Sequence, residues 1–248
     1  MKTTAMIGLG MVSGTHAAAI ADTGGRVVLG GVMSTSPDKA QAFAADYAVK
    51  HGLPEPKVYT SVEQIATDPG IDFALVCTPP NARQELVNAL VAARKPILLE
   101  KPIERTLEAA EKIVATCETA GVPLGIMFQH RVREASVRLA GMLQAQAFGE
   151  IALVEIVVPW WREQAYYDEP GRGSYARDGG GVLISQAIHT MDLALSLVGP
   201  VSAVQAMART SALHRMESED IVTAGLEFAS GAIGMLYAST ASFPGRPE

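Results

Sequence analysis

This sequence of 248 residues has few cysteines, no net positive charge and no long apolar run. Its two cysteines, Cys77 and Cys117, have no C-x-x-C partner, which argues against disulfides and against a structural metal site. The formal net charge of -6 argues against nucleic acid or an anionic membrane as the main partner. No apolar run approaches the roughly 18 residues of a membrane-spanning helix, and the first residues lack the features of a signal peptide. We therefore expect a soluble protein of the reducing cytoplasm.

Apolar residues, by contrast, make up 48% of the chain, which is enough for a large core. The first half alternates strand-like and helix-like segments. Strands are expected over residues 3–9, 26–33, 58–60, 71–80, 96–102 and 122–128. Longer helices are expected over residues 16–25, 36–52, 81–95 and 106–121, with Ser36 and Asn81 as caps. This alternation predicts right-handed crossovers and a doubly wound parallel sheet of the α/β class.

The pattern changes in the second half of the chain. Helices are expected over residues 134–146 and 182–199, and strands over residues 151–161, 201–210, 221–229 and 231–240. Because parallel alternation does not continue, we expect a second domain with a mostly antiparallel sheet. The predicted domains are a dinucleotide-binding domain at 1–124 and a substrate and oligomerisation domain at 125–248.

A glycine-rich turn follows the first strand, in the sequence GLGMVSG. Gly8 allows a tight turn, and Gly10 lets the backbone approach a pyrophosphate at the start of the next helix. Ser13 takes the place of the last glycine of the G-x-G-x-x-G pattern. The strand before the turn and the helix after it favour a nucleotide site over a simple bend. Gly8, Gly10, Met11 and Val12 are therefore candidate cofactor-binding residues.

The end of the second strand bears on the choice of cofactor. An acidic residue there would bind the ribose hydroxyls of NAD. This sequence instead has Ser34 and Thr35, whose hydroxyls suit a free ribose or a 2′-phosphate. NAD and NADP both stay open as cofactors, with a slight preference for NADP.

Two residues are candidates for the chemistry. Lys101 directly follows the apolar run PILLE, and ligands of open α/β sheets bind beyond the carboxyl ends of strands. His189 interrupts an apolar helix, 182–199, that we expect to be buried, as do Gln186 and Asp192. The glycines of DGGG at 178–181 are expected to allow close approach of a ligand just before this helix.

Four segments occur in this order along the chain: GLGMVSGTHAAAI, VCTPPN, EKP and DGGGVLISQAIHTMD. Together they resemble the glucose-fructose oxidoreductase, inositol dehydrogenase and rhizopine-catabolism family, Gfo/Idh/MocA. The resemblance implies an amino-terminal Rossmann domain and a carboxyl-terminal open-sheet domain, with Lys101 and His189 beside the reacting carbon. The dinucleotide would be lined by Thr78, Pro79, Asn81, Glu100 and Lys101. It also implies a homo-oligomer, a dimer or a tetramer.

Two departures from the family pattern stand out. Many members have aspartate four residues before the histidine, where this chain has Ser185, so a Lys-Asp-His arrangement is not expected. The chain is also short for the family and stops at SFPGRPE, which suggests a truncated second domain. We expect marginal solubility, because a sheet edge and apolar surface would be uncovered.

The loop WWREQAYYDEPGRGSYARDGGG combines aromatic rings with arginines. Aromatic faces suit a sugar ring or a planar carbocycle, and arginines suit a carboxylate. We expect Arg162, Tyr167 and Arg172 to bind an anionic substrate, together with Gln186 and His189. Within the family, the loop resembles those of sugar 3-dehydrogenases and of dihydrodiol-type dehydrogenases of aromatic acids.

The predicted function is hydride transfer between NAD(P) and a secondary alcohol of a sugar or cyclic polyol, with or without a carboxylate. An imidazole has an ordinary pKa of about 6.5, which suits His189 as the base, with Lys101 stabilising the developing alkoxide; the reverse assignment stays open. The alternatives are a dihydrodiol-type dehydrogenase and a non-catalytic nucleotide-binding sensor. Of the other histidines, His16 is expected to pack, His130 to face the crevice, and His51 and His214 to lie in surface loops.

Overall fold

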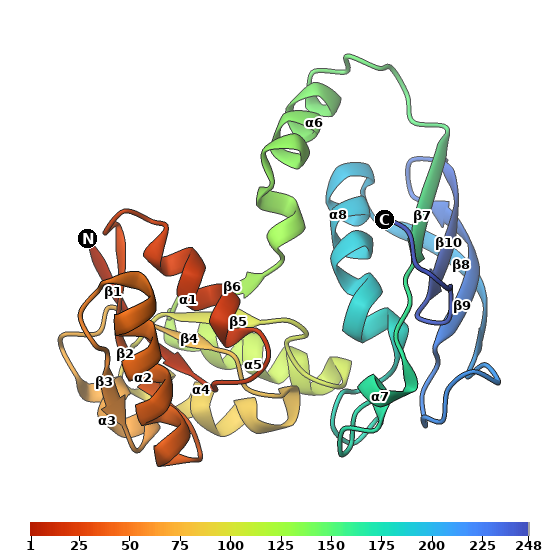
Figure 1. The fold of residues 1–248 in the computed structure, drawn as a ribbon. Helices are drawn as coiled ribbons and strands as arrows, with labels where there is room; N and C mark the ends of the chain where they lie inside the picture. Colours follow the sequence, from red (N-terminus) through yellow and green to blue (C-terminus); the bar gives the residue numbers. More distant parts are fainter. Residues whose placement is uncertain (248) are drawn as a thin grey trace. The chain divides into compact units, whose positions relative to one another are not determined.

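The structure is a computed structural model that describes residues 1–247. It divides into two compact units, Met1–Met127 and Phe128–Glu248, which are described separately (Figure 1). Strand β6 (Leu124–Met127) belongs to the first unit, which therefore extends past the residue 124 expected from the sequence. No helix within residues 1–247 is both long and apolar enough to cross a membrane.

The first unit contains a six-stranded sheet in the order β3-β2-β1-β4-β5-β6, in which every pairing is parallel. Its other strands are β1 (Lys2–Ile7), β2 (Val27–Met33), β3 (Lys57–Tyr59), β4 (Phe73–Val76) and β5 (Ile97–Glu100). The strand order reverses between β1 and β4, which is where a doubly wound sheet opens a crevice for a ligand. The predicted α/β class and doubly wound sheet are confirmed.

The helices of this unit are α1 (Ser13–Ala21), α2 (Pro37–His51), α3 (Val62–Thr67), α4 (Arg83–Ala92) and α5 (Leu107–Ala120). Ser36 caps α2 as predicted, because its hydroxyl accepts the N–H of Lys39. The prediction that Asn81 caps the next helix is wrong. Asn81 lies inside a short 3₁₀ turn, η1 (Pro80–Ala82), and α4 begins after it with no side-chain cap.

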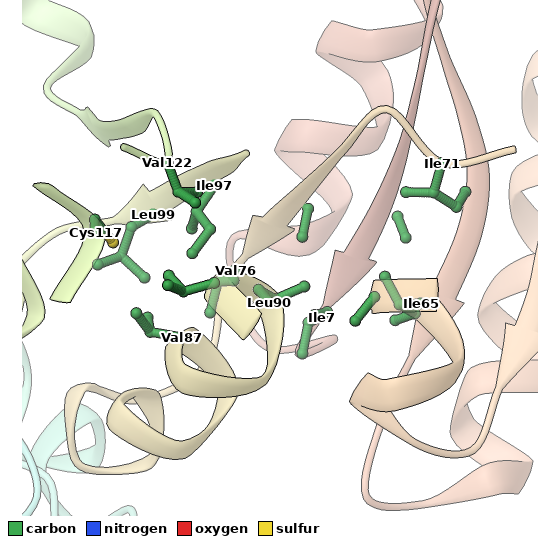
Figure 2. Close-up of a cluster of buried hydrophobic side chains, with 14 of the residues drawn as sticks. Ile7, Ile65, Ile71, Val76, Val87, Leu90, Ile97, Leu99, Cys117 and Val122 are labelled. Carbon is green, nitrogen blue, oxygen red and sulfur yellow. The ribbon is translucent and has the colours of Figure 1, made fainter. Parts of the chain in front are cut away.

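Two apolar clusters cover the two faces of this sheet. Because side chains alternate along a strand, Ile7 joins one cluster and Met6 the other. The first cluster packs α3, α4 and α5 against the strands; Val87 and Leu90 of α4 lie near Val76 in it (Figure 2). The second packs α1 and α2 on the opposite face. Each fully buried Val, Leu or Ile contributes about 1.5–3 kcal/mol, so the loops at the strand ends rest on a rigid base.

The second unit contains a mixed four-stranded sheet in the order β7-β10-β9-β8. Its strands are β7 (Leu153–Pro159), β8 (Val201–Arg209), β9 (Ile221–Phe228) and β10 (Ile233–Ser239). Strand β10 pairs parallel with β7, and the other two pairings are antiparallel. The expected mostly antiparallel sheet is thus confirmed.

The helical segments of the second unit are η2 (Gln129–Val132), α6 (Glu134–Gln144), α7 (Gln164–Tyr167), η3 (Leu183–Ala187) and α8 (Ile188–Val198). The helix expected over 182–199 is therefore a π-helical turn, η3, followed by α8. The prediction that this helix is buried is wrong for part of its surface. Its residues Met191 and Ala194 pack on the sheet core, whereas Leu195 is 40% exposed.

Candidate active site

The two glycines of the turn after β1 have different surroundings. Gly8 has a φ of +93°, and a Cβ added there would lie 2.8 Å from the backbone nitrogen of Thr78, so only glycine fits. A Cβ on Gly10 would meet nothing within 4 Å. Packing within the chain therefore explains why residue 8 is glycine, but it does not explain why residue 10 is glycine. Close approach of a ligand to the backbone would explain the glycine at position 10.

The amino terminus of α1 is suited to an anion. It has no side-chain cap and no acidic residue in its first turn, and the Ser13 hydroxyl donates to the carbonyl of Gly10 at 2.7 Å. Met11 and Val12 before it are 70% and 38% exposed. Uncapped N–H groups and the helix dipole favour a phosphate at such a position. The residues of this turn thus fit the pyrophosphate of a dinucleotide.

Further cofactor candidates lie at the carboxyl ends of β2 and β4. Ser34 and Thr35 follow β2, and the Ser34 hydroxyl accepts the N–H of Ser36 at 3.3 Å. Pro79 and Asn81 are exposed after β4. The Thr78 hydroxyl is buried and has no hydrogen-bond partner among residues 1–247. An unsatisfied buried hydroxyl costs about 1–3 kcal/mol, which a ligand bound at this edge of the sheet would relieve.

Glu100, at the end of β5, is held by its neighbours in a fixed orientation. Nε2 of His16 lies 2.7 Å from one carboxylate oxygen, and the N–H of Lys101 donates to the other at 3.1 Å. Burial acts to raise the pKa of Glu100, but the hydrogen bond and charge of His16 and the charge of Lys101 outweigh it and lower the pKa. His16 is therefore a hydrogen-bonding residue and not only a packing residue, which corrects the expectation from the sequence.

Arg83, which the sequence analysis missed, lies beside these residues. It is 2% exposed, and its Nε and Nη2 donate to the carbonyl of Thr78 at 3.1 and 2.7 Å. Its Nη1 donates to the carbonyls of Glu100 and Pro102. One signal could have revealed it: Arg83 precedes Val87 and Leu90 at the four- and seven-residue spacing of the apolar face of α4.

In the second unit, His189 is the second residue of α8 and is buried. Its ring is 7% exposed and lies with its centroid 5.1 Å from that of His130 and 6.2 Å from that of Phe128. Gln186, one turn earlier, donates through Nε2 to the hydroxyl of Tyr166 at 3.3 Å. The side-chain amide oxygen of Gln186, Oε1, is buried and has no partner in the described part of the chain. This side chain thus keeps an unused acceptor one helical turn from His189.

The glycine run before this helix makes its close contact with the chain itself. A Cβ on Gly181 would lie 1.8 Å from the carbonyl oxygen of Glu219. The Glu219 carboxylate accepts the N–H groups of Gly181 and Leu183 at 3.0 and 3.1 Å, and so satisfies the start of the helix. At Gly181 the expectation of close approach by a ligand is wrong, because Glu219 occupies that position.

The predicted substrate-binding residues differ in their surroundings. Arg172 donates to the carboxylate of Glu169 through Nε at 2.8 Å, which neutralises its charge. Arg162 has no carboxylate partner within residues 1–247, and its guanidinium lies 5.2 Å from the Trp160 ring and 5.5 Å from the Tyr166 ring. Arg162 is therefore the arginine with charge available for an anion.

Tyr167 and Tyr166 also differ. The Tyr167 hydroxyl lies 2.6 Å from that of Thr240 inside the unit, and burial raises the pKa of Tyr167 to about 12. The Tyr166 hydroxyl instead accepts from Arg172 at 3.1 Å and from Gln186. Tyr166, which the sequence analysis passed over, therefore connects the aromatic loop to η3.

His214 is not a surface residue as expected. It is 6% exposed; its Nδ1 lies 2.6 Å from a carboxylate oxygen of Asp220, and its Nε2 lies 2.8 Å from the carbonyl of Arg162. The pair thereby supports the backbone at Arg162 from inside the unit.

Together, the parallel sheet and the glycine turn define a dinucleotide-binding protein with a second domain. Residues 2–128 match a family model described as the oxidoreductase family with an NAD-binding Rossmann fold, and residues 137–248 match the GFO/IDH/MocA C-terminal domain. The chain belongs to the Gfo/Idh/MocA oxidoreductase family. This match confirms the predicted family and a nicotinamide dinucleotide as its cofactor class.

Several characterised proteins are similar to this chain. The 1,5-anhydro-D-fructose reductase of Ensifer adhaerens is 30% identical over 88% of this chain and 63% of its own length. The WlbA dehydrogenase of Bordetella pertussis, solved with NADH and UDP-GlcNAcA, is 31% identical with a TM-score of 0.88, covering 100% of this chain and 69% of that one. A levoglucosan dehydrogenase solved with NADH and levoglucosan is 25% identical with a TM-score of 0.84, covering 98% and 68% of the two chains. The chain thus spans less than two thirds of the curated reductase that it matches.

Proposed function

We propose that the protein is an NAD(P)-dependent oxidoreductase that transfers a hydride between nicotinamide and a secondary alcohol of a carboxylated sugar or cyclic polyol. The observation that carries the proposal is the glycine turn, with its open Gly10 and uncapped α1, in a domain of the NAD-binding family. The named dehydrogenases and reductases among its relatives support the same class of reaction.

The cofactor supplies the hydride chemistry, and the residues of the first unit supply its site. Gly8, Gly10, Met11 and Val12 would contact the pyrophosphate, and Ser34 and Thr35 the ribose. The nicotinamide end would be lined by Thr78, Pro79, Asn81, Glu100 and Lys101. Because the end of β2 offers two hydroxyls and no carboxylate, both NAD and NADP fit this site.

His189 and Lys101 are the proposed chemical groups. His189 accepts the hydroxyl proton as the carbonyl forms, and the Lys101 ammonium stabilises negative charge on that oxygen. His189→Asn is expected to lower kcat by at least about 100-fold and to remove the acidic limb of the kcat profile. If kcat and its pH profile were unchanged in His189→Asn, Lys101 would be the base instead.

The carboxylate of the substrate is assigned to Arg162. Its unpaired charge favours it over Arg172, whose partner is Glu169. The ligand of the Bordetella pertussis relative is itself a sugar acid derivative, as its name states. Arg162→Gln is expected to raise KM for a uronic acid substrate about tenfold while leaving kcat within about threefold, and Arg172→Gln to change KM little. Equal effects of the two changes, or a loss confined to kcat, would contradict the assignment.

The overall test is a titration with NADH and NADPH followed by a turnover screen of sugar acids, neutral sugars, inositols and aromatic dihydrodiols. Cofactor binding with turnover of a sugar acid supports the proposal. Turnover of aromatic dihydrodiols alone would point to the alternative dehydrogenase, and binding without any turnover to a nucleotide sensor. Size-exclusion chromatography with light scattering would test the predicted dimer or tetramer, and cell fractionation the predicted cytoplasmic location.

A further inference from the structure

Arg83 occupies an unusual position for a buried cation. Its guanidinium is surrounded by backbone carbonyls of two loops, the one after β4 and the one after β5. Burial lowers the pKa of Arg83 to about 10, with the charge of Glu100 opposing this, so the side chain stays protonated at neutral pH. A buried charge must be compensated, and here several carbonyl dipoles provide that compensation.

The contacts of Arg83 converge on the backbone of Lys101. Nη1 donates to the carbonyl of Glu100, directly before Lys101, and to that of Pro102, directly after it. The N–H of Lys101 donates to the Glu100 carboxylate. The backbone on both sides of the lysine is thus fixed by hydrogen bonds to charged groups.

The same guanidinium connects this segment to Thr78. Nε and Nη2 both donate to the Thr78 carbonyl, and the Thr78 hydroxyl is a buried group that lacks a partner in residues 1–247. A planar guanidinium with five donors can hold both loops at once, whereas an ammonium is a single nitrogen. We propose that Arg83 is a positioning residue that sets the separation between Thr78 and Lys101, and thereby places Lys101 for reaction at the nicotinamide. This inference rests on the proposed function.

Lys95 offers a matched comparison within the same unit. It is also buried, and its Nζ donates to the carbonyls of Asp68 and Ile71, so it joins the amino ends of β4 and β5. Arg83 joins the carboxyl ends of the same two strands. Loss of either cation should destabilise the unit, but only Arg83 lies at the edge of the sheet where ligands bind.

The test compares Arg83→Met, Arg83→Lys and Lys95→Met in the full chain. Thermal denaturation, NADH affinity by fluorescence, and kcat and KM for the sugar acid identified by the turnover screen are measured for each. Both methionine variants are expected to lower Tm. Arg83→Met should also lower kcat at least about tenfold, since misplacement by about 1 Å can cost about 100-fold. Arg83→Lys should recover part of kcat, and Lys95→Met should keep kcat and NADH affinity within about twofold of the wild type.

A second measurement tests the proposal if Arg83→Met folds poorly or if the protein turns over none of the screened substrates. Amide hydrogen exchange on the conservative variant Arg83→Lys should rise in residues 99–105 and stay unchanged in residues 66–73. Wild-type kcat and NADH affinity in Arg83→Met, or exchange at 99–105 equal to the wild type in Arg83→Lys, would overturn the inference. Failure of the wild type to bind either cofactor would instead refute the proposed function, and the exchange result would still decide whether Arg83 orders the segment around Lys101.

Discussion

Substitution of each of the two glycines in the first turn should separate an effect on stability from an effect on cofactor binding. Gly8→Ala adds a methyl group 2.8 Å from the backbone nitrogen of Thr78, at a φ of +93°. The left-handed conformation costs a residue with a Cβ about 1–2 kcal/mol, and overpacking costs about 1–3 kcal/mol. The free energy of unfolding of the first unit should therefore fall by about 2–5 kcal/mol, a shift in Tm on the order of 10 °C.

Gly10→Ala should behave in the opposite way. The added methyl group meets nothing within 4 Å, and the φ of Gly10 lies outside the left-handed region. Stability should change little or rise by up to about 1 kcal/mol through the smaller entropy of the unfolded chain. The methyl group would, however, stand where the pyrophosphate approaches the backbone. NADH affinity should fall at least tenfold, which is about 1.4 kcal/mol or more.

Circular dichroism melting and NADH fluorescence titration measure the two effects separately. The expected pattern is a Gly8→Ala variant with low Tm, and a Gly10→Ala variant with the Tm of the wild type and weak NADH binding. If Gly10→Ala bound NADH as tightly as the wild type, the dinucleotide would not approach this turn, and the assignment of the cofactor site would be wrong.

Three further predictions concern stability. Gly181→Ala should lower the free energy of unfolding of the second unit by about 3 kcal/mol or more, because the methyl group would displace the backbone of Glu219; urea denaturation checks this, and a change below about 1 kcal/mol would refute it. Asp220→Asn should cost about 3–5 kcal/mol by breaking the buried pair with His214, and a melting temperature equal to that of the wild type would contradict this. The pKa of Asp68 is lowered to about 2, mainly by the hydrogen bond from the Tyr59 hydroxyl. The ionised Asp68 carboxylate therefore stabilises the fold fully above about pH 4, and this stabilisation is lost as pH falls toward 2. Asp68→Asn should flatten the dependence of Tm on pH between these two values.

Much of the architecture followed from local patterns. Ser36 and Pro37 mark the start of α2 and Gly52 its end, because capping and turn chemistry depend on a few adjacent residues. The position of Lys101 directly after β5 followed from an apolar run of strand length. Asn81 was misplaced as a cap because a 3₁₀ turn begins at Pro80 and moves the cap of α4 to Ala82, a difference of one residue that local signals do not resolve.

The candidate site was predictable only where its chemistry lies within one element. Gln186 and His189 share a helical face because of the helical period, and the glycine turn follows directly from its strand. Arg83 was missed because its partners are carbonyls, which every residue has and which no pattern marks. Arg162 and Arg172 looked equivalent, because the neutralising Glu169 is nearby in sequence to both.

By itself, then, the amino-acid sequence determined the order and type of the longer elements, the family, and the residues at the strand ends, since these depend on interactions between near neighbours. Only the tertiary structure decided which charges and polar groups have partners inside the fold. It pairs Glu219 with the glycine run, Asp220 with His214, and Arg83 with the carbonyls around Lys101. Glu219 lies 38 residues from Gly181, and Pro102 lies 19 residues from Arg83, so only the packing of the fold brings these partners within hydrogen-bonding distance. His214 and Asp220 are only six residues apart, but no sequence pattern marks them as a pair.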